Sequence, residues 1–177
     1  MKKELLLILI TLIIFSCASK KSIPQANTSE QEKTTKNFIC PEDGICTIKI
    51  LKNQSLSIKI DEFNHLYYQT KANIETSIII FEYNRKALEG LQDGNYREEI
   101  IFEIDNSVSK LELQNEFLNG TKMIFGRHCY CKGQAGYFSV KKGSLTLVKN
   151  KEGINFNLEF TVTEVPQIVK HINYIVK

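Results

Sequence analysis

The stretch INFNLEFTVT, residues 154–163, is the most regular pattern in this 177-residue chain. Its apolar and polar side chains alternate without a break. Because successive side chains of a β-strand point to opposite faces, this alternation predicts a strand with one face in a hydrophobic core and the other in water. The chain is therefore expected to form sheets rather than helices.

The same two-residue period extends outward through the rest of the chain. It recurs over 56–60 and 100–104, while Ile78 to Phe81 is apolar on both faces, which is typical of a central strand. Helical periodicity is hard to find. The predicted strands are 45–51, 55–61, 65–70, 76–84, 97–105, 110–114, 121–131, 136–141, 144–149, 153–163 and 168–176.

Turn signals separate these strands. Polar or glycine-containing segments at 52–54, 119–120, 141–143 and 150–153 predict tight turns, and 85–95 predicts a loop or one short helical turn. About ten short strands with short connections predict an all-β fold, either an antiparallel β-sandwich or a small β-barrel. We place this globular domain at residues 38–177.

The amino-terminal segment has the composition of a signal peptide. Lys2 and Lys3 precede an apolar run from Leu5 to Phe15, broken only by Thr11. A run of about eleven residues is too short to cross ~30 Å of hydrocarbon as a helix. Residues 1–16 are therefore interpreted as a cleaved signal and not as a transmembrane anchor.

The end of this segment, Ile14 to Cys17, resembles the lipobox of bacterial lipoproteins, although Phe15 stands where a small residue is usual. The resemblance implies that Cys17 becomes the first mature residue and carries a diacylglycerol, usually with a further acyl chain such as palmitate. Two or three acyl chains give lasting membrane attachment. Since Ala18 is not the aspartate that retains lipoproteins in the inner membrane, the outer membrane is the expected location. The alternative is an ordinary secretory peptide with an incidental cysteine.

Residues 17–37 are predicted to be the acylated cysteine and a flexible linker. Ser, Thr, Asn, Gln, Lys and Glu dominate, and Pro24 interrupts any helix. The formal net charge of the whole chain is only +3, and no basic block stands out. This composition excludes nucleic-acid binding, which needs many phosphate contacts.

Four further cysteines fit an exported protein and are predicted to form disulfides. They fall into two groups, Cys40 with Cys46 and Cys129 with Cys131. Because a bridge between Cys129 and Cys131 would close a very small ring, we expect each cysteine of one group to pair with one of the other. The alternative closes Cys40 with Cys46 and leaves the other two paired or free.

Residues 128–131 also suggest a second function. Thiolates at Cys129 and Cys131 could bind a metal or exchange electrons, with His128 beside them. On a strand, however, His128 points to the face opposite the two cysteines, so we assign no metal site. Structural disulfides are the preferred interpretation.

No catalytic residues are assigned, and the protein is predicted not to be an enzyme. The chain has no nucleophile elbow, phosphate loop, EF-hand or zinc-protease helix. His65 and His171 are isolated. Glu99, Glu103 and Asp105 share a strand face that we expect to be solvated, whereas Glu98 lies on the opposite face. A hydrolase remains a minor alternative that requires a cleft with a histidine near a carboxylate. No cofactor is expected apart from the lipid on Cys17.

A glycine-bracketed loop next to the cysteine pair is the predicted binding site. It contains Gly133, Gln134, Gly136 and Tyr137. A loop held by a disulfide is ordered in advance for recognition, and the alternative is a plain hairpin turn. We therefore expect a lipid-anchored, non-enzymatic binding or structural module of the cell envelope, with a protein or glycan partner; the thiol-based function is the alternative.

Overall fold

The computed structural model describes residues 39–87, 90 and 94–175, all of which belong to the compact unit Thr34–Lys177. The predicted signal, Cys17 and the linker lie outside the described residues. The described part contains nine strands and one 3-10 helix. They are β1 (Gly44–Ile60), β2 (Leu66–Arg85), β3 (Tyr96–Asp105), β4 (Lys110–Gln114), η1 (Asn115–Thr121), β5 (Ile124–Cys129), β6 (Gly136–Ser139), β7 (Lys142–Lys149), β8 (Ile154–Thr161) and β9 (His171–Tyr174).

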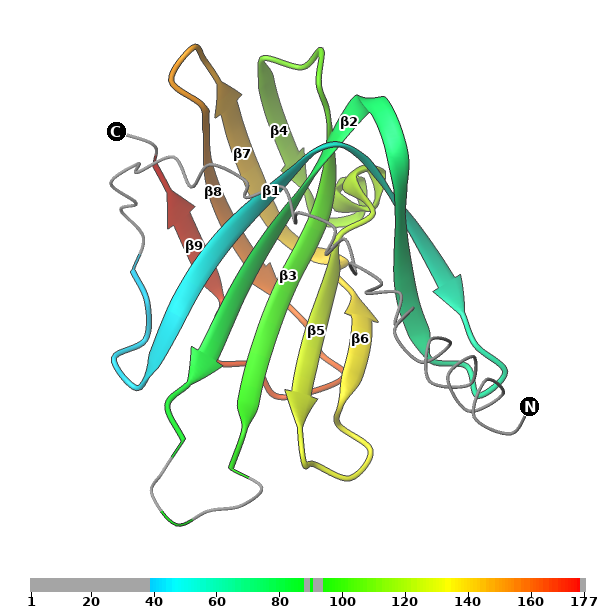
Figure 1. Cartoon of the computed structure of the whole chain (residues 1–177), viewed down its shortest axis with the longest axis vertical. Coiled ribbons are helices and arrows are strands. Elements are labelled where there is room, and N and C mark those ends of the chain that lie inside the picture. Colours follow the sequence, from blue (N-terminus) through cyan, green and yellow to red (C-terminus); the bar gives the residue numbers. More distant parts are fainter. Residues whose placement is uncertain (1–38, 88–89, 91–93, 176–177) are drawn as a thin grey trace, which may run out of the picture. The chain divides into compact units, whose positions relative to one another are not determined.

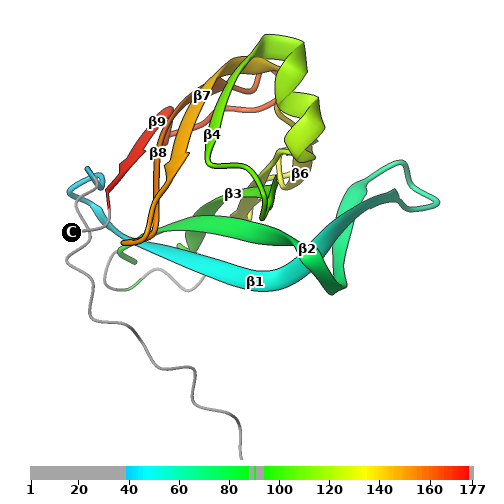
Figure 2. The same cartoon turned by 90° about the horizontal axis from the view of Figure 1, so that it is seen from above.

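The strands form two antiparallel sheets, which confirms the all-β prediction (Figure 1). One sheet has the order β1-β2-β3-β5-β6 and the other β4-β7-β8-β9. The sheets lie in two layers, with η1 at one side (Figure 2). No helix in the part of the chain that the structure describes is long and apolar enough to cross a membrane.

The main core fills the space between the layers. Strand β8 alternates buried and more exposed positions from Ile154 to Thr161, as its sequence predicts. Its Phe156 meets Phe102 of the other sheet edge to face, with ring centroids 5.5 Å apart. Such aromatic pairs contribute about 1 kcal/mol beyond the burial of their area.

A buried carboxylate joins the two layers. Glu98 on β3 is only 1% exposed, and its oxygens accept hydrogen bonds from the backbone N–H groups of Ile168 and Val169 at 2.7 and 2.8 Å. The Tyr96 hydroxyl donates a third bond at 2.5 Å. Glu98 therefore fixes the segment before β9 against the five-stranded sheet.

The predicted turn at 52–54 is wrong. β1 runs through these residues as one long strand with a bulge, where the register shifts between Lys52 and Gln54 and Asn53 takes a φ of 58°. Likewise β2 continues through the gap expected between 70 and 76. Asparagine tolerates the left-handed conformation, so a polar signal that favours a turn also serves a bulge, which bends a strand without ending it.

Beyond the bend, residues 54–60 and 66–72 form a projecting hairpin that we call the arm (Figures 1 and 2). The arm returns to the sheet where Leu66 pairs with Tyr137 of β6, which closes a small barrel. A second core fills it, built on Leu56, Ile78, Ile101 and Ile124. The sandwich and the barrel that the sequence offered as alternatives thus occur together.

The predicted turn at 119–120 is also replaced. Asn119 and Gly120 lie inside η1, whose Leu118 is fully buried in the main core. A 3-10 helix of seven residues has too few turns to show periodicity in a sequence. The described residues of 86–95 belong to no strand or helix, as expected of a loop.

Candidate functional site

A row of polar residues crosses the sheet near one end of the strands. Asn84 on β2, Arg97 on β3 and His128 on β5 are register partners, and we call them the polar row. Because paired residues in neighbouring strands point to the same face, all three lie on the side of the sheet that carries the second core. The sheet therefore presents an amide, a guanidinium and an imidazole side by side.

Glu99 holds this row in place from the adjacent register position. Its side chain is only 7% exposed, and its oxygens lie 3.2 Å from His128 Nε2, 2.9 Å from the Tyr137 hydroxyl and 3.2 Å from Arg97 Nη1. An ionised carboxylate only accepts hydrogen bonds, so His128 and Tyr137 donate to it, while Arg97 forms an ion pair with it. Glu99 is thus a buried acceptor that orients two members of the row.

The same contacts set the protonation states. Burial by itself would raise the pKa of Glu99, but the hydrogen bonds from His128 and Tyr137 and the charge of Arg97 outweigh it, so the pKa lies below its ordinary value. Burial and the Glu99 charge raise the pKa of the Tyr137 hydroxyl. Glu99 therefore stays ionised at neutral pH and Tyr137 stays a donor.

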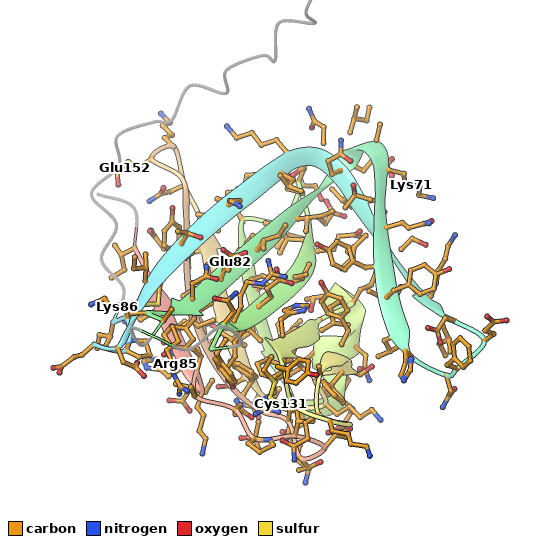
Figure 3. The ribbon with its side chains drawn as sticks, turned by 60° about the horizontal axis from the view of Figure 1, so that its bottom comes forward. Lys71, Glu82, Arg85, Lys86, Cys131 and Glu152 are labelled. Atoms are coloured by element: carbon orange, nitrogen blue, oxygen red, sulfur yellow. A yellow bond between two sulfur atoms is a disulfide. The ribbon has the colours of Figure 1, made fainter. Side chains whose placement is uncertain are left out.

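Glu82 completes the support of the row. Its oxygens lie 3.4 Å from Arg97 Nη1 and accept a 2.6 Å hydrogen bond from the Asn84 amide nitrogen. Glu82 lies opposite Glu99 in the register, so Arg97 bridges two carboxylates on neighbouring strands. Figure 3 views the domain from the end where Arg85 and Cys131 lie, with Glu82 also labelled.

A glycine makes room for these contacts. A methyl group on Gly126 would lie 2.6 Å from the Tyr137 ring and 2.9 Å from His128 Nε2, closer than real Cβ contacts. Gly126 pairs with Glu99 on one side and with Tyr137 on the other. Only a residue without a side chain lets both rings reach the carboxylate here.

The polar row opens into a cavity of about 480 Å³ at the strand ends, which we call the strand-end pocket. Its rim includes Tyr130, whose surface is 88% exposed, and Arg85, which binds Asp43 at 3.1 Å. The full lining is Asn84, Arg85, Asn95, Tyr96, Arg97, His128, Cys129 and Tyr130. This volume falls in the range of pockets that bind small molecules.

The lining is rich in hydrogen-bonding side chains. Among the described residues that line it there is no serine, threonine or unpaired cysteine to act as a nucleophile. What the pocket offers is a set of oriented hydrogen-bonding groups and an exposed aromatic ring.

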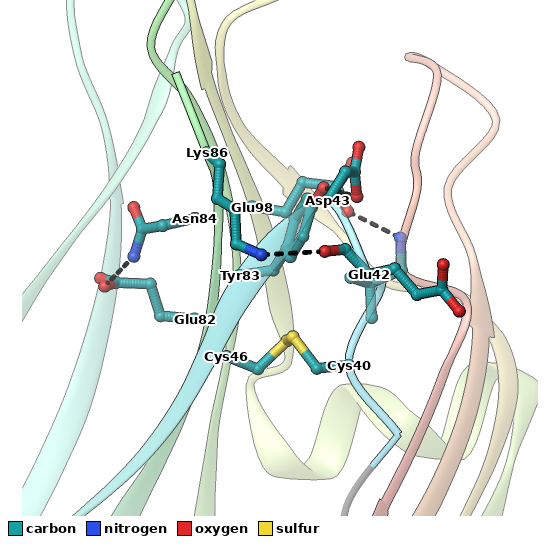
Figure 4. Close-up of a disulfide and its surroundings, with 10 residues drawn as sticks. Cys40, Glu42, Asp43, Cys46, Glu82, Tyr83, Asn84, Lys86 and Glu98 are labelled. Atoms are coloured by element: carbon teal, nitrogen blue, oxygen red, sulfur yellow. Dashed lines mark hydrogen bonds between the residues drawn. A yellow bond between two sulfur atoms is a disulfide. The ribbon is translucent and has the colours of Figure 1, made fainter. Parts of the chain in front are cut away.

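The disulfide pairing differs from the one expected. The structure joins Cys40 to Cys46, as Figure 4 shows, and Cys129 to Cys131, instead of one group to the other. Cys46 and Cys129 lie on β1 and β5, with β2 and β3 between them. Three strand spacings separate them by about 14 Å, well beyond the ~7 Å limit for a disulfide, whereas both local pairs have Cα atoms less than 6 Å apart.

The thiol-based function loses its free ligands in this arrangement. Cys129 and Cys131 are bonded to each other, and no three His, Cys, Asp or Glu side chains of the described residues are grouped to hold a metal ion. The Cys129–Cys131 bridge instead closes a small ring that displays Tyr130 at the pocket rim.

The predicted binding loop lines a different cavity, of about 400 Å³. Gly133, Gly136 and Tyr137 line it together with His65 from the tip of the arm. Gln134 is not among the lining residues. Its side-chain and backbone oxygens accept hydrogen bonds of 2.9 and 3.1 Å from Arg127, which fixes the loop to β5.

Sequence reasoning missed the polar row because it treated Glu99 as part of a solvated face. The alternation along β3 correctly separates Glu98 from Glu99, but the arm then covers the second face near Glu99. Tyr68 of the arm lies edge to face against Tyr137, with ring centroids 5.4 Å apart. A carboxylate on the predicted strand 97–105 and a histidine on the predicted strand 121–131 were the available signal, but the sequence does not say that these strands pair.

Comparison of the chain with protein-family models, curated sequences and solved structures finds no match.

Proposed function

We propose that this protein is a lipid-anchored binding module of a bacterial cell envelope, attached through Cys17 and binding its ligand in the strand-end pocket. The lipobox-like sequence ending at Cys17 supports attachment, and the outer membrane is the location that Ala18 favours. The two disulfides agree with an oxidising, exported environment. The partner would be another envelope component, a protein or a glycan.

The polar row is the observation that carries the binding proposal. Orienting Arg97 and His128 by a buried carboxylate has a cost in desolvation. Such preorganised polar groups beside a pocket are typical of recognition sites, because a ligand then binds without first ordering them. The exposed Tyr130 at the rim adds a contact surface.

Attachment is tested by cell fractionation. The native chain should sediment with membranes and release a lipid-modified amino-terminal peptide at Cys17, whereas Cys17→Ser should appear in the soluble fraction. Continued sedimentation of Cys17→Ser, or an unmodified amino terminus elsewhere, would contradict the anchor.

Binding in the pocket is tested by photo-crosslinking in intact cells. A benzophenone-bearing phenylalanine replaces Tyr130 at the rim or, as a matched control, Tyr67, an exposed tyrosine of the arm. Envelope material should attach to position 130 and not to position 67. Equal labelling at both positions, or none at 130, would contradict a site in the strand-end pocket.

A hydrolytic function is the second candidate, because His128 and Glu99 meet the condition of a histidine beside a carboxylate at a pocket. It would require a water molecule as nucleophile, activated by the imidazole. Captured material that is released in shortened form by the native chain, but intact from His128→Asn, would favour it. Titration of free thiols in the denatured, unreduced protein tests the thiol-based alternative, which needs reactive thiols.

A further inference from the structure

We infer that the strand-end pocket binds an uncharged, polyhydroxylated ligand, a saccharide unit of an envelope glycan. The ligand class rests on the proposed function, since an exported and anchored domain meets such glycans. The hydrogen-bonding pattern of the row, its balance of charge and the position of Tyr130 support it.

The polar row offers both acceptors and donors. The Asn84 amide nitrogen is engaged by Glu82, which leaves its oxygen as the acceptor toward the pocket. Arg97 has only donors, and His128 contacts Glu99 through Nε2, which leaves Nδ1 as the ring nitrogen that does not face this carboxylate. A hydroxyl group both donates and accepts, so neighbouring hydroxyls of a sugar can donate to the Asn84 oxygen and accept from Arg97 N–H groups. The row spans roughly 10 Å across three strands, about the length of a disaccharide.

The charges near the pocket argue against an ionic ligand. Arg85 is paired with Asp43, and Arg97 is paired with both Glu82 and Glu99. The guanidinium groups are therefore already matched by carboxylates among the described residues, and an anion would gain little from them. They still offer N–H donors that no carboxylate occupies, because each guanidinium has five.

Tyr130 supplies the apolar contact that a sugar ring needs. Its surface is 88% exposed, although it lies between two cysteines whose disulfide fixes the local backbone. By contrast, the Tyr96 ring has the guanidinium of Arg85 4.7 Å from its centroid and is only partly exposed. Tyr130 is therefore the aromatic face available at the rim for stacking against the C–H face of a saccharide.

Calorimetric titration of the full chain, purified from membranes in detergent, tests the ligand class. The two neutral probes are cellobiose and N,N′-diacetylchitobiose. The anionic probe is digalacturonic acid, and the cationic probe is chitobiose. A neutral probe should bind more tightly than either charged one. Tyr130→Ala and Asn84→Ala should each weaken its binding about fivefold, while Tyr67→Ala should leave it unchanged.

Since Tyr130 is almost fully exposed, its replacement leaves the fold intact, and thermal unfolding of each variant confirms this. Preference for a charged probe, or equal affinities of Tyr130→Ala and Tyr67→Ala, would overturn the inference. If no probe binds while position 130 still crosslinks to envelope material, the ligand class is wrong and the proposed function stands. If both experiments fail, both proposals fall.

Discussion

Glu98 offers the sharpest test of how the two layers are held together. In Glu98→Gln the side chain keeps its shape, but one oxygen becomes an NH₂ group that cannot accept from a backbone N–H. The oxygen nearer Val169 accepts one bond of 2.8 Å, whereas the other accepts both Ile168 N–H and the Tyr96 hydroxyl. The least costly arrangement therefore leaves Val169 N–H without an acceptor.

The magnitude follows from that loss. A hydrogen bond to a charged group contributes about 1.5–3 kcal/mol, and a buried N–H left unpaired costs about 1–3 kcal/mol. Because these terms overlap, we expect Glu98→Gln to lower the free energy of unfolding by about 3 kcal/mol. For a domain of this size that corresponds to a fall in Tm of about 10 °C.

The assay is urea and thermal unfolding followed by circular dichroism, with both disulfides intact. Glu112→Gln is the matched control, because it makes the same chemical change at an exposed position, where the carboxylate pairs with the exposed Lys110. The control should stay within about 0.5 kcal/mol of the native protein. A loss of less than 1 kcal/mol for Glu98→Gln would refute the reasoning that this carboxylate joins the layers.

Three further predictions concern the site and the disulfides. The pKa of Glu99 is lower in the folded protein than its ordinary value, so the ionised carboxylate stabilises the fold fully above that ordinary value, and this stabilisation disappears as the pH falls through the folded pKa. The free energy of unfolding of Glu99→Gln should therefore depend less steeply on pH than that of the native protein between neutrality and pH 3. Gly126→Ala should lower the free energy of unfolding by about 1–3 kcal/mol and shift the Tyr137 ring resonances in NMR spectra, and no change in either would contradict the close packing seen there. Replacing Cys40 and Cys46 together by serine opens a short loop and should lower the free energy of chemical unfolding by about 2 kcal/mol. Peptide mapping of the native chain should recover the two local disulfides and none that joins Cys40 or Cys46 to Cys129 or Cys131.

The strands could be predicted because each carries its own signal. The strand over residues 154–163 was predicted correctly because one face of β8 is buried in the main core and the other is not. The central strand over Ile78 to Phe81 was predicted correctly because β2 has a hydrophobic core on each side, with Ile79 in the main core and Ile78 in the second. Burial of one face leaves a two-residue period in the sequence, and burial of both faces leaves a continuous apolar run.

The arm could not be predicted, because its bend depends on contacts between distant segments. Asn53 gives the same signal whether the chain turns or bulges, and the choice is made by β2, whose Thr76 hydroxyl donates to the Gln54 carbonyl at 2.8 Å. The arm in turn decides that Glu99 is buried. The polar row could therefore be recognised only in the three-dimensional structure, although the sequence already showed that Glu98 and Glu99 lie on opposite faces of their strand.

The cysteine pairing failed for a related reason. Ring size in the sequence disfavoured the bond between Cys129 and Cys131, but strand order, which the sequence does not state, forbids the alternative. The local bridge forms where β5 ends and the chain turns toward β6.

The most direct test of the central claim is an NMR titration of the isotopically labelled full chain with soluble fragments of envelope glycan. Binding in the strand-end pocket predicts that chemical-shift changes concentrate at Asn84, Asn95, Arg97, His128 and Tyr130. Changes centred instead on the cavity beside Gly133 and His65, or an unchanged spectrum, would contradict it.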